Sequence, residues 1–174
     1  LRTIEITKRQ QFSTPLPLSV AAEYALDLGE DESVMEPTAG EGNLLAPLPT
    51  FTAIVANEID PRRVALLWLQ GIRATQGDAL RTPMAASTAI MNPPWGKYTT
   101  QRYGKPIPLP YGVSVDVAER FVAMVLRELP PGGRVVAIMQ TTILKAPKFM
   151  AWLRKEHTLR ALIPSPPGAY ATRG

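Results

Sequence analysis

Short apolar runs alternate along the chain with longer segments in which apolar residues recur every three or four positions. The short runs predict buried strands at 33–35, 52–57, 72–76, 88–91, 134–139 and 159–163. The periodic segments predict helices at 19–28, 61–70, 115–129 and 147–157, with a brief helix at 44–48. Strands that alternate with helices are typical of a doubly wound α/β fold with a mostly parallel sheet.

Apolar stripes on two of the predicted helices indicate which face is buried. The stripe of 19–28 comprises Val20, Ala21, Tyr24 and Leu28, and that of 115–129 comprises Val117, Phe121, Met124, Val125 and Leu129. Trp68 and Trp152 also lie on apolar helical faces. We therefore expect both indoles in the core.

A polar residue follows each of the first four predicted strands. These residues are Glu36, Glu58, Asp78 and Asn92. Ligands of doubly wound sheets bind beyond the carboxyl ends of the strands, so we expect all four to share one crevice. The loop after the first strand also contains Gly40 and Gly42, which allow the backbone to approach a ligand closely.

The tetrapeptide Asn92-Pro93-Pro94-Trp95 comes directly after the strand 88–91. Its prolines have a fixed φ and no N–H group, so they cannot extend a sheet, and nearby carbonyls stay available as acceptors. Asn92 adds a side-chain acceptor and Trp95 a broad aromatic face. Together they suit a planar amine that donates two hydrogen bonds while its ring stacks on the indole. The alternative is a proline turn packed on the core.

The stretch 96–112 is irregular, basic and rich in tyrosine. It contains Lys97, Tyr98, Arg102, Tyr103 and Lys105 and no acidic residue. Cations interleaved with aromatic rings suit phosphates and unstacked bases, so these five residues are candidates for binding nucleic acid. The alternative is an insertion without a ligand.

Composition and charge narrow the class of protein. The length of 174 residues suits one domain, and the net charge of +4 divides unequally. Residues 1–78 contain 6 Lys and Arg against 11 Asp and Glu, whereas residues 79–174 contain 13 against 4. A basic second half suits a phosphate backbone, and an acidic first half suits a cationic or hydroxyl-rich ligand. Surface charge that only solubilises the fold is the alternative.

Some functional classes are excluded by residues that the chain lacks. It has no cysteine and one histidine, His157, so we expect no disulfide, cysteine nucleophile or metal site. No apolar run approaches the roughly 18 residues of a membrane span, and residues 1–5 lack the apolar core of a signal peptide. We expect a soluble cytoplasmic protein.

The order of these motifs resembles the class I methyltransferases that use S-adenosylmethionine, and within them the N6-adenine DNA methylases. Gln11-Phe12-Ser13-Thr14-Pro15 resembles their N-terminal cofactor motif, the loop 36–42 their Asp/Glu-Pro-x-x-Gly-x-Gly loop, and residues 92–95 their Asn-Pro-Pro-aromatic catalytic motif. The resemblance covers about residues 11–163 and is nearest to methylase domains of large mobile-element and phage proteins. Glu36 replaces the more frequent Asp, and Trp95 the more frequent Tyr or Phe.

The resemblance implies a Rossmann-like fold, S-adenosylmethionine as cofactor and a role for each motif. Glu36 would hold the methionine amino group directly or through water, Glu58 the ribose hydroxyls and Asp78 the adenine amino group, with residues 12–15 over the methionine end. The implied cofactor-binding residues are Phe12, Ser13, Thr14, Pro15, Glu36, Pro37, Thr38, Gly40, Gly42, Asn43, Glu58, Ile59, Asp78, Ala79 and Asn92. The implied catalytic residues are Asn92, Pro93, Pro94 and Trp95.

The resemblance also implies one methyltransferase domain over 1–174. Its parts are a cofactor-covering segment and helix (1–30), a cofactor-binding core (31–95), a substrate loop (96–113) and the second half of the sheet (114–174). The terminal strand hairpin of the family would follow Gly174. We therefore expect a piece of a larger protein of bacterial, plasmid or phage origin, fused to or working with a helicase or target-recognition domain.

The expected function is methyl transfer to N6 of adenine in DNA. Three alternatives stay open at this point. They are methylation of a base amine in RNA, methylation of a glutamine amide in protein, and a catalytically idle nucleic-acid-binding module of a larger helicase-like protein.

Overall fold

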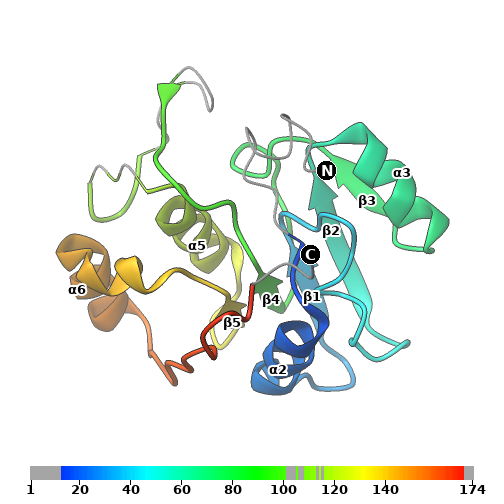
Figure 1. Ribbon diagram of the computed structural model, residues 1–174. Coiled ribbons are helices and arrows are strands. Elements are labelled where there is room, and N and C mark those ends of the chain that lie inside the picture. Colours follow the sequence, from blue (N-terminus) through cyan, green and yellow to red (C-terminus); the bar gives the residue numbers. More distant parts are fainter. Residues whose placement is uncertain (1–12, 101–104, 106–107, 113, 115, 171–174) are drawn as a thin grey trace.

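Five parallel strands form one sheet with the order β3-β2-β1-β4-β5 (Figure 1). The structure is a computed structural model that describes residues 13–100, 105, 108–112, 114 and 116–170. The strands are β1 (Ser33–Glu36), β2 (Ala53–Glu58), β3 (Ala74–Gln76), β4 (Thr88–Met91) and β5 (Arg134–Ala137). This arrangement confirms the predicted doubly wound α/β fold, whose strand order reverses direction between β1 and β4.

Helices cover both faces of the sheet. They are α2 (Leu16–Leu26), α3 (Pro61–Leu69), α5 (Val117–Glu128), the 3₁₀ helix η1 (Thr141–Lys145) and α6 (Pro147–Glu156). Successive strand residues point to opposite faces, so Val34 and Ile90 join the cluster of α2 and α3, whereas Met35 and Met91 join that of α5 and α6. The central strands β1 and β4 are therefore buried between two layers.

Aspartate caps fix the starts of α3 and α5. The side chain of Asp60 accepts a hydrogen bond from the Arg62 backbone N–H, and that of Asp116 accepts one from the Glu119 N–H at 3.1 Å. Such caps satisfy N–H groups that have no partner within the helix. Both helices agree with the prediction, with ends that differ by at most two residues. Among the described residues no helix is long and apolar enough to cross a membrane.

The buried face predicted for the first helix is wrong. The helix α2 begins at Leu16, and its buried residues are Ser19, Ala22 and Leu26, whereas Val20 and Tyr24 are 49% and 84% exposed. Apolar residues occur around most of this helix, so its periodicity does not distinguish one face from another. Trp68 also lies outside the core. Its indole is 55% exposed and donates to the Ala74 carbonyl oxygen at 3.0 Å.

Two further predicted elements are absent from the described part of the chain. Residues 44–48 form consecutive turns instead of a helix. Residues 159–163 form no strand, and Leu162 and Ile163 are 61% and 72% exposed. An apolar run becomes a strand only where a neighbour pairs with its backbone, and this run instead continues into the proline-containing segment 164–167.

Arg134 ties the two halves of the fold together. It lies at the start of β5 and donates to the carbonyl oxygens of Leu26 (3.0 Å) and Asp27 (2.8 Å) at the end of α2. Its guanidinium also forms an ion pair with Glu32 that holds the pKa of that carboxyl below its ordinary value. Carbonyls at a helix end lack partners in the helix, and a cation there is favourable.

Candidate active site

The polar residues predicted at four strand ends lie along one edge of the sheet. Glu36 and Glu58 are the last residues of β1 and β2, Asn92 directly follows β4, and Asp78 follows β3 by two positions. Because the strands are ordered β3-β2-β1-β4, the four residues follow one another along this edge in the spatial order Asp78, Glu58, Glu36 and Asn92. The parallel sheet therefore brings together side chains from four separate segments.

The Glu58 carboxylate is buried and already holds the backbone around it. Its Oε2 accepts the Gly40 N–H at 2.8 Å, and its Oε1 accepts the N–H groups of Ile59 and Asp60, both at 2.8 Å. Two carboxylate oxygens offer about four acceptor positions, so room for another donor remains. The neighbouring Ile59 side chain is 49% exposed and presents an apolar surface beside this acceptor.

The Glu36 carboxyl is 1% exposed and belongs to the turn that follows β1. Its Oε1 accepts both the Thr38 N–H (2.9 Å) and the Thr38 hydroxyl (3.1 Å). Burial, with a smaller effect from the charge of Glu58, raises the pKa of Glu36 to about 8. The carboxyl is therefore mostly protonated at neutral pH, and a cation beside it would favour its ionised form.

The loop that follows β1 requires glycine at two positions. Gly40 and Gly42 have φ angles of 59° and 86°, which side-chain-bearing residues rarely adopt. A Cβ on Gly42 would also lie 3.0 Å from Gln70 Oε1 and 3.1 Å from Leu67 Cδ2. The glycine loop therefore curves tightly over α3, with the Gly40 N–H directed at Glu58.

Thr14 connects the N-terminal motif to both the glycine loop and Asn92. Its carbonyl accepts a hydrogen bond from Asn43 Nδ2 at 3.2 Å, and its hydroxyl accepts one from Asn92 Nδ2 at 3.0 Å. Ser13 donates to Glu41 in the same loop, and Pro15 is the residue before α2. Phe12, the remaining predicted residue of this motif, lies outside the described residues.

Asp78 stabilises the turn after β3. Its Oδ1 accepts the Leu80 N–H at 3.1 Å, and its Oδ2 lies 3.5 Å from Arg81 Nε. Ala79 beside it is buried.

Sequence reasoning missed Asn57, whose Nδ2 donates to the carbonyls of Pro37 and Gly77 and so joins the ends of three strands. A polar residue inside an otherwise apolar strand was the signal for it.

Asn92 and Trp95 meet a residue that sequence reasoning did not anticipate. Asn92 Nδ2 donates to the hydroxyl of Tyr170 at 3.0 Å, and the Tyr170 ring lies edge-on to Trp95 at 5.1 Å between centroids. Trp95 also lines a small hollow with Gln140 and Thr142, which follow β5. No local signal marks Tyr170, because it is 78 residues from Asn92.

The described part of the loop 96–113 is anchored on α5. The backbones of Lys97 and Asp116, the residue before α5, form an isolated antiparallel β-bridge. The Arg120 guanidinium lies 4.1 Å from the centre of the Tyr98 ring. The Tyr98 hydroxyl donates to the carbonyl of Lys105, whose side chain is exposed. Arg102 and Tyr103 lie outside the described residues.

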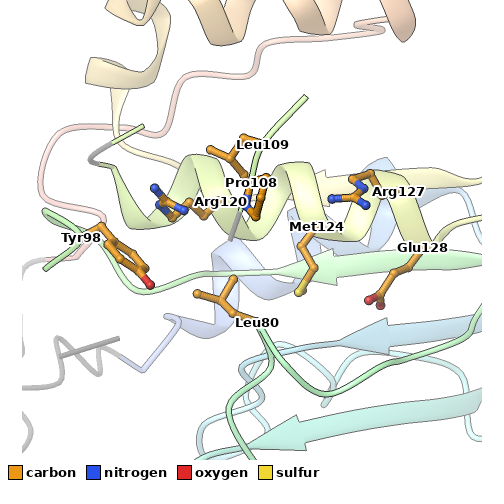
Figure 2. A pocket seen from close by; sticks show the side chains of 8 residues that line it. All are labelled: Leu80, Tyr98, Pro108, Leu109, Arg120, Met124, Arg127 and Glu128. Atoms are coloured by element: carbon orange, nitrogen blue, oxygen red, sulfur yellow. The ribbon is translucent and has the colours of Figure 1, made fainter. Parts of the chain in front are cut away.

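A cavity of about 230 Å³ runs along α5 beside this loop (Figure 2). Its lining comprises Leu80, Tyr98, Pro108, Leu109, Arg120, Met124, Arg127 and Glu128. Of the predicted site residues only Tyr98 contributes to that lining. The cavity is thus separate from the line of strand-end acids.

The fold is that of the class I S-adenosylmethionine-dependent methyltransferases. A candidate member from Listeria monocytogenes matches 84% of this chain with a TM-score of 0.67 and 19% identity. The modification subunit of a candidate type I restriction enzyme from Vibrio vulnificus matches 83% with a TM-score of 0.64 and 21% identity. The EcoKI M protein, also of a type I restriction enzyme, matches 82% with a TM-score of 0.64 and 20% identity.

These similarities concern the fold. The chain spans 53% of the Listeria protein and 37% of each restriction-enzyme subunit. No protein-family model and no curated protein matches the sequence.

Proposed function

We propose that this chain transfers a methyl group from S-adenosylmethionine to N6 of adenine in DNA. The observation that carries the proposal is the Asn92-Pro93-Pro94-Trp95 motif at the end of β4, in line with the buried acids that end β1 and β2. The similarity of the fold to two subunits of type I restriction enzymes supports DNA as the substrate.

The donor set at the strand ends fits S-adenosylmethionine. Glu36 would hold its cationic amino group, Glu58 a ribose hydroxyl at its remaining acceptor position and Asp78 its adenine amino group. The glycine loop, whose positive φ angles keep it tight, leaves backbone close to such a ligand, and Ile59 offers an exposed apolar surface next to Glu58. Residues 12–15 and Asn43 would close the methionine end. The cofactor supplies an electrophilic methyl group when bound.

The catalytic motif would orient the substrate amine. The lone pair of an adenine amino group is delocalised into the ring, which makes the nitrogen a poor nucleophile. Asn92 Oδ1 and the Pro93 carbonyl would each accept one amine hydrogen, which favours a pyramidal nitrogen with a localised lone pair. Trp95 would stack on the base once it has left the duplex, at a cost of a few kcal/mol for unstacking.

Positive charge on the second half of the chain supports a nucleic acid over a protein glutamine. Residues 79–174 carry 13 Lys and Arg against 4 Asp and Glu. The loop 96–113, with Lys97, Tyr98, Arg102, Tyr103 and Lys105, would contact phosphates and bases. We propose that target recognition uses this loop together with a helicase or target-recognition domain, in the same or a partner protein.

RNA is the second candidate substrate. A candidate RNA methyltransferase from Pyrococcus horikoshii shares the fold over 84% of this chain, with a TM-score of 0.57 and 16% identity. An idle binding module is disfavoured because such a module has no need for Glu36, Glu58, Asp78 and Asn92 together.

Radiolabelled methyl transfer to DNA, RNA and a bulk protein mixture tests the proposal, with the methylated product identified by mass spectrometry of the digested nucleosides. We expect N6-methyladenine from DNA, and a signal reduced to background in Asn92→Ala. Calorimetric titration of that variant with S-adenosylmethionine checks that the cofactor still binds. Activity undiminished in Asn92→Ala would refute the mechanism, and no binding of the cofactor to the wild-type chain would refute the proposed function.

A further inference from the structure

Tyr170 contacts both functional groups of the Asn92-Pro93-Pro94-Trp95 motif. Its hydroxyl accepts a hydrogen bond from Asn92 Nδ2 at 3.0 Å, and its ring meets the Trp95 indole edge-on, with an angle of 72° between the planes. Edge-to-face contacts are a favoured geometry for aromatic pairs. One side chain therefore touches the predicted amine acceptor and the predicted stacking surface together.

The two N–H groups of the Asn92 side chain have two matching acceptors. One is the Tyr170 hydroxyl and the other is the Thr14 hydroxyl, each 3.0 Å from Nδ2. Burial raises the pKa of Tyr170 to about 12, so its hydroxyl is neutral at physiological pH and has lone pairs to accept with. With Nδ2 engaged in this way, Oδ1 is the side-chain atom that remains to accept a hydrogen bond.

The backbone that carries Tyr170 is restricted before it reaches the motif. From α6 the chain continues without regular structure through 158–166 and then forms a turn at 167–170, near β4 in Figure 1. Pro164, Pro166 and Pro167 fix three φ angles, and the Ala169 N–H bonds the Pro166 carbonyl at 3.1 Å. A segment restricted in this way loses less conformational entropy when it holds a side chain in one place.

We propose that Tyr170 is a positioning residue which, together with Thr14, holds the Asn92 amide so that Oδ1 faces the substrate amine. This inference rests on the function proposed above. If the amide were rotated by 180°, its own N–H groups would meet the N–H groups of the substrate, and the amine would lose an acceptor. The same phenol ring would keep the Trp95 indole in the plane on which the base stacks.

Nuclear magnetic resonance of the side-chain amides tests the contact without any enzymatic activity. The chain has three asparagines, at positions 43, 57 and 92, so ¹⁵N-asparagine labelling gives three side-chain amide signals, and Asn92→Ala assigns one of them. In Tyr170→Phe, which keeps the ring but removes the acceptor, we expect one Nδ2 proton of Asn92 to move upfield and to exchange faster with water. The matched control is Tyr24→Phe, at a phenol that is 84% exposed on α2, and it should leave all three signals unchanged.

Steady-state kinetics then separate orientation from binding. We expect kcat of Tyr170→Phe to fall about tenfold, the rate equivalent of one hydrogen bond, while the Kd for S-adenosylmethionine and the melting temperature stay near the wild-type values. Tyr170→Leu, which also removes the contact with Trp95, should raise the KM for DNA as well.

Two outcomes overturn the inference, and neither is confused with failure of the proposed function. An Asn92 amide signal that is identical in wild type and Tyr170→Phe would refute the hydrogen bond. An unchanged kcat in Tyr170→Phe would refute its role in orientation. Absence of methyl transfer by the wild-type chain would instead refute the proposed function, while the amide signals would still decide whether Tyr170 holds Asn92.

Discussion

The two sides of the sheet edge, β1 to β3 on one side and the segments after β4 on the other, are built in different ways. On the first side the carboxyl groups of Glu36 and Glu58 are buried and bonded to N–H groups of their own loops. On the second side Asn92 and Trp95 are held by a distant residue, Tyr170, next to a basic loop with the exposed Lys97 and Lys105. Rigid acceptors suit one small ligand of fixed shape, whereas exposed cations around an aromatic suit a flexible polyanion.

The largest effect should come from the second side, at Asn92, the proposed acceptor for the substrate amine. We expect Asn92→Ala to lower kcat by about 10²–10³-fold, the usual loss when one preorganised polar group at a reacting centre is removed. Single-turnover methyl transfer measures this loss. Asn92 is also one of the implied cofactor-binding residues and bonds Thr14, so calorimetry with S-adenosylmethionine separates its two roles. A loss of cofactor affinity as large as the loss of rate would contradict the division between the two sides.

On the first side, Glu58→Gln should weaken cofactor binding by about a hundredfold. In the wild type both carboxylate oxygens accept backbone N–H groups. The amide of glutamine keeps one oxygen, but its NH₂ group cannot accept, so the loop loses hydrogen bonds worth about 1–3 kcal/mol each. Calorimetry with S-adenosylmethionine measures the change. Glu30→Gln, at an exposed turn residue, is the matched control, and equal affinities of the two variants would exclude Glu58 from the cofactor site.

Arg134 links the two sides, so its removal should weaken both. We expect Arg134→Met to lower the free energy of unfolding by about 2 kcal/mol, because hydrogen bonds from a charged group to Leu26, Asp27 and Glu32 are lost. Urea unfolding measures this change. Substitutions at ordinary surface positions change the free energy of unfolding by about 0.5 kcal/mol or less. A destabilisation of that size would show that the fold does not depend on the contacts of Arg134.

The pH dependence of the first side should follow Glu36. Its pKa is about 8 in the folded chain and near 4.5 in the unfolded one. Between these values the folded state keeps a proton that the unfolded state releases, so the contribution of Glu36 to stability is greatest below pH 4.5 and falls as pH rises towards 8. Urea midpoints at pH 5 and pH 8 test the sign, with Glu36→Gln expected to flatten the difference.

The same carboxyl predicts how cofactor affinity depends on pH. A cationic amino group prefers the ionised form of Glu36, so affinity should rise from pH 6 towards pH 8, and binding at pH 7 should release a proton. Calorimetry in buffers of different ionisation enthalpy counts that proton. Affinity that is independent of pH would place the amino group elsewhere.

The smallest effect concerns the exposed cations of the second side. Replacing Lys97 and Lys105 together by alanine should weaken DNA binding a few-fold and reduce the slope of log K against log salt by about 2, one for each lost phosphate contact. Fluorescence anisotropy over a salt series measures the slope. The control Lys148→Ala with Lys155→Ala, at exposed residues of α6, should change it less. An equal change of the slope in both double variants would show that the DNA interface is not confined to the loop 96–113.

The sequence by itself determined the order of the strands along the chain and the polar residues that follow them. Buried strands such as 88–91 are short apolar runs between turn residues, and this signal is local. Parallel strands share a carboxyl edge, so Glu36, Glu58, Asp78 and Asn92 could be assigned to one edge before any contact was known. Caps such as Asp60 and Asp116 likewise act on their own helices.

The tertiary structure alone decided which surfaces are covered and which distant residues meet. An α2 that is apolar on most sides has no periodicity to show that Val20 and Tyr24 face solvent. The run 159–163 is a strand only if a neighbour pairs with it, and in this fold it leads instead to the turn that brings Tyr170 to Asn92. Pairing and long-range contact depend on the path of the whole chain, and no window of sequence contains that path.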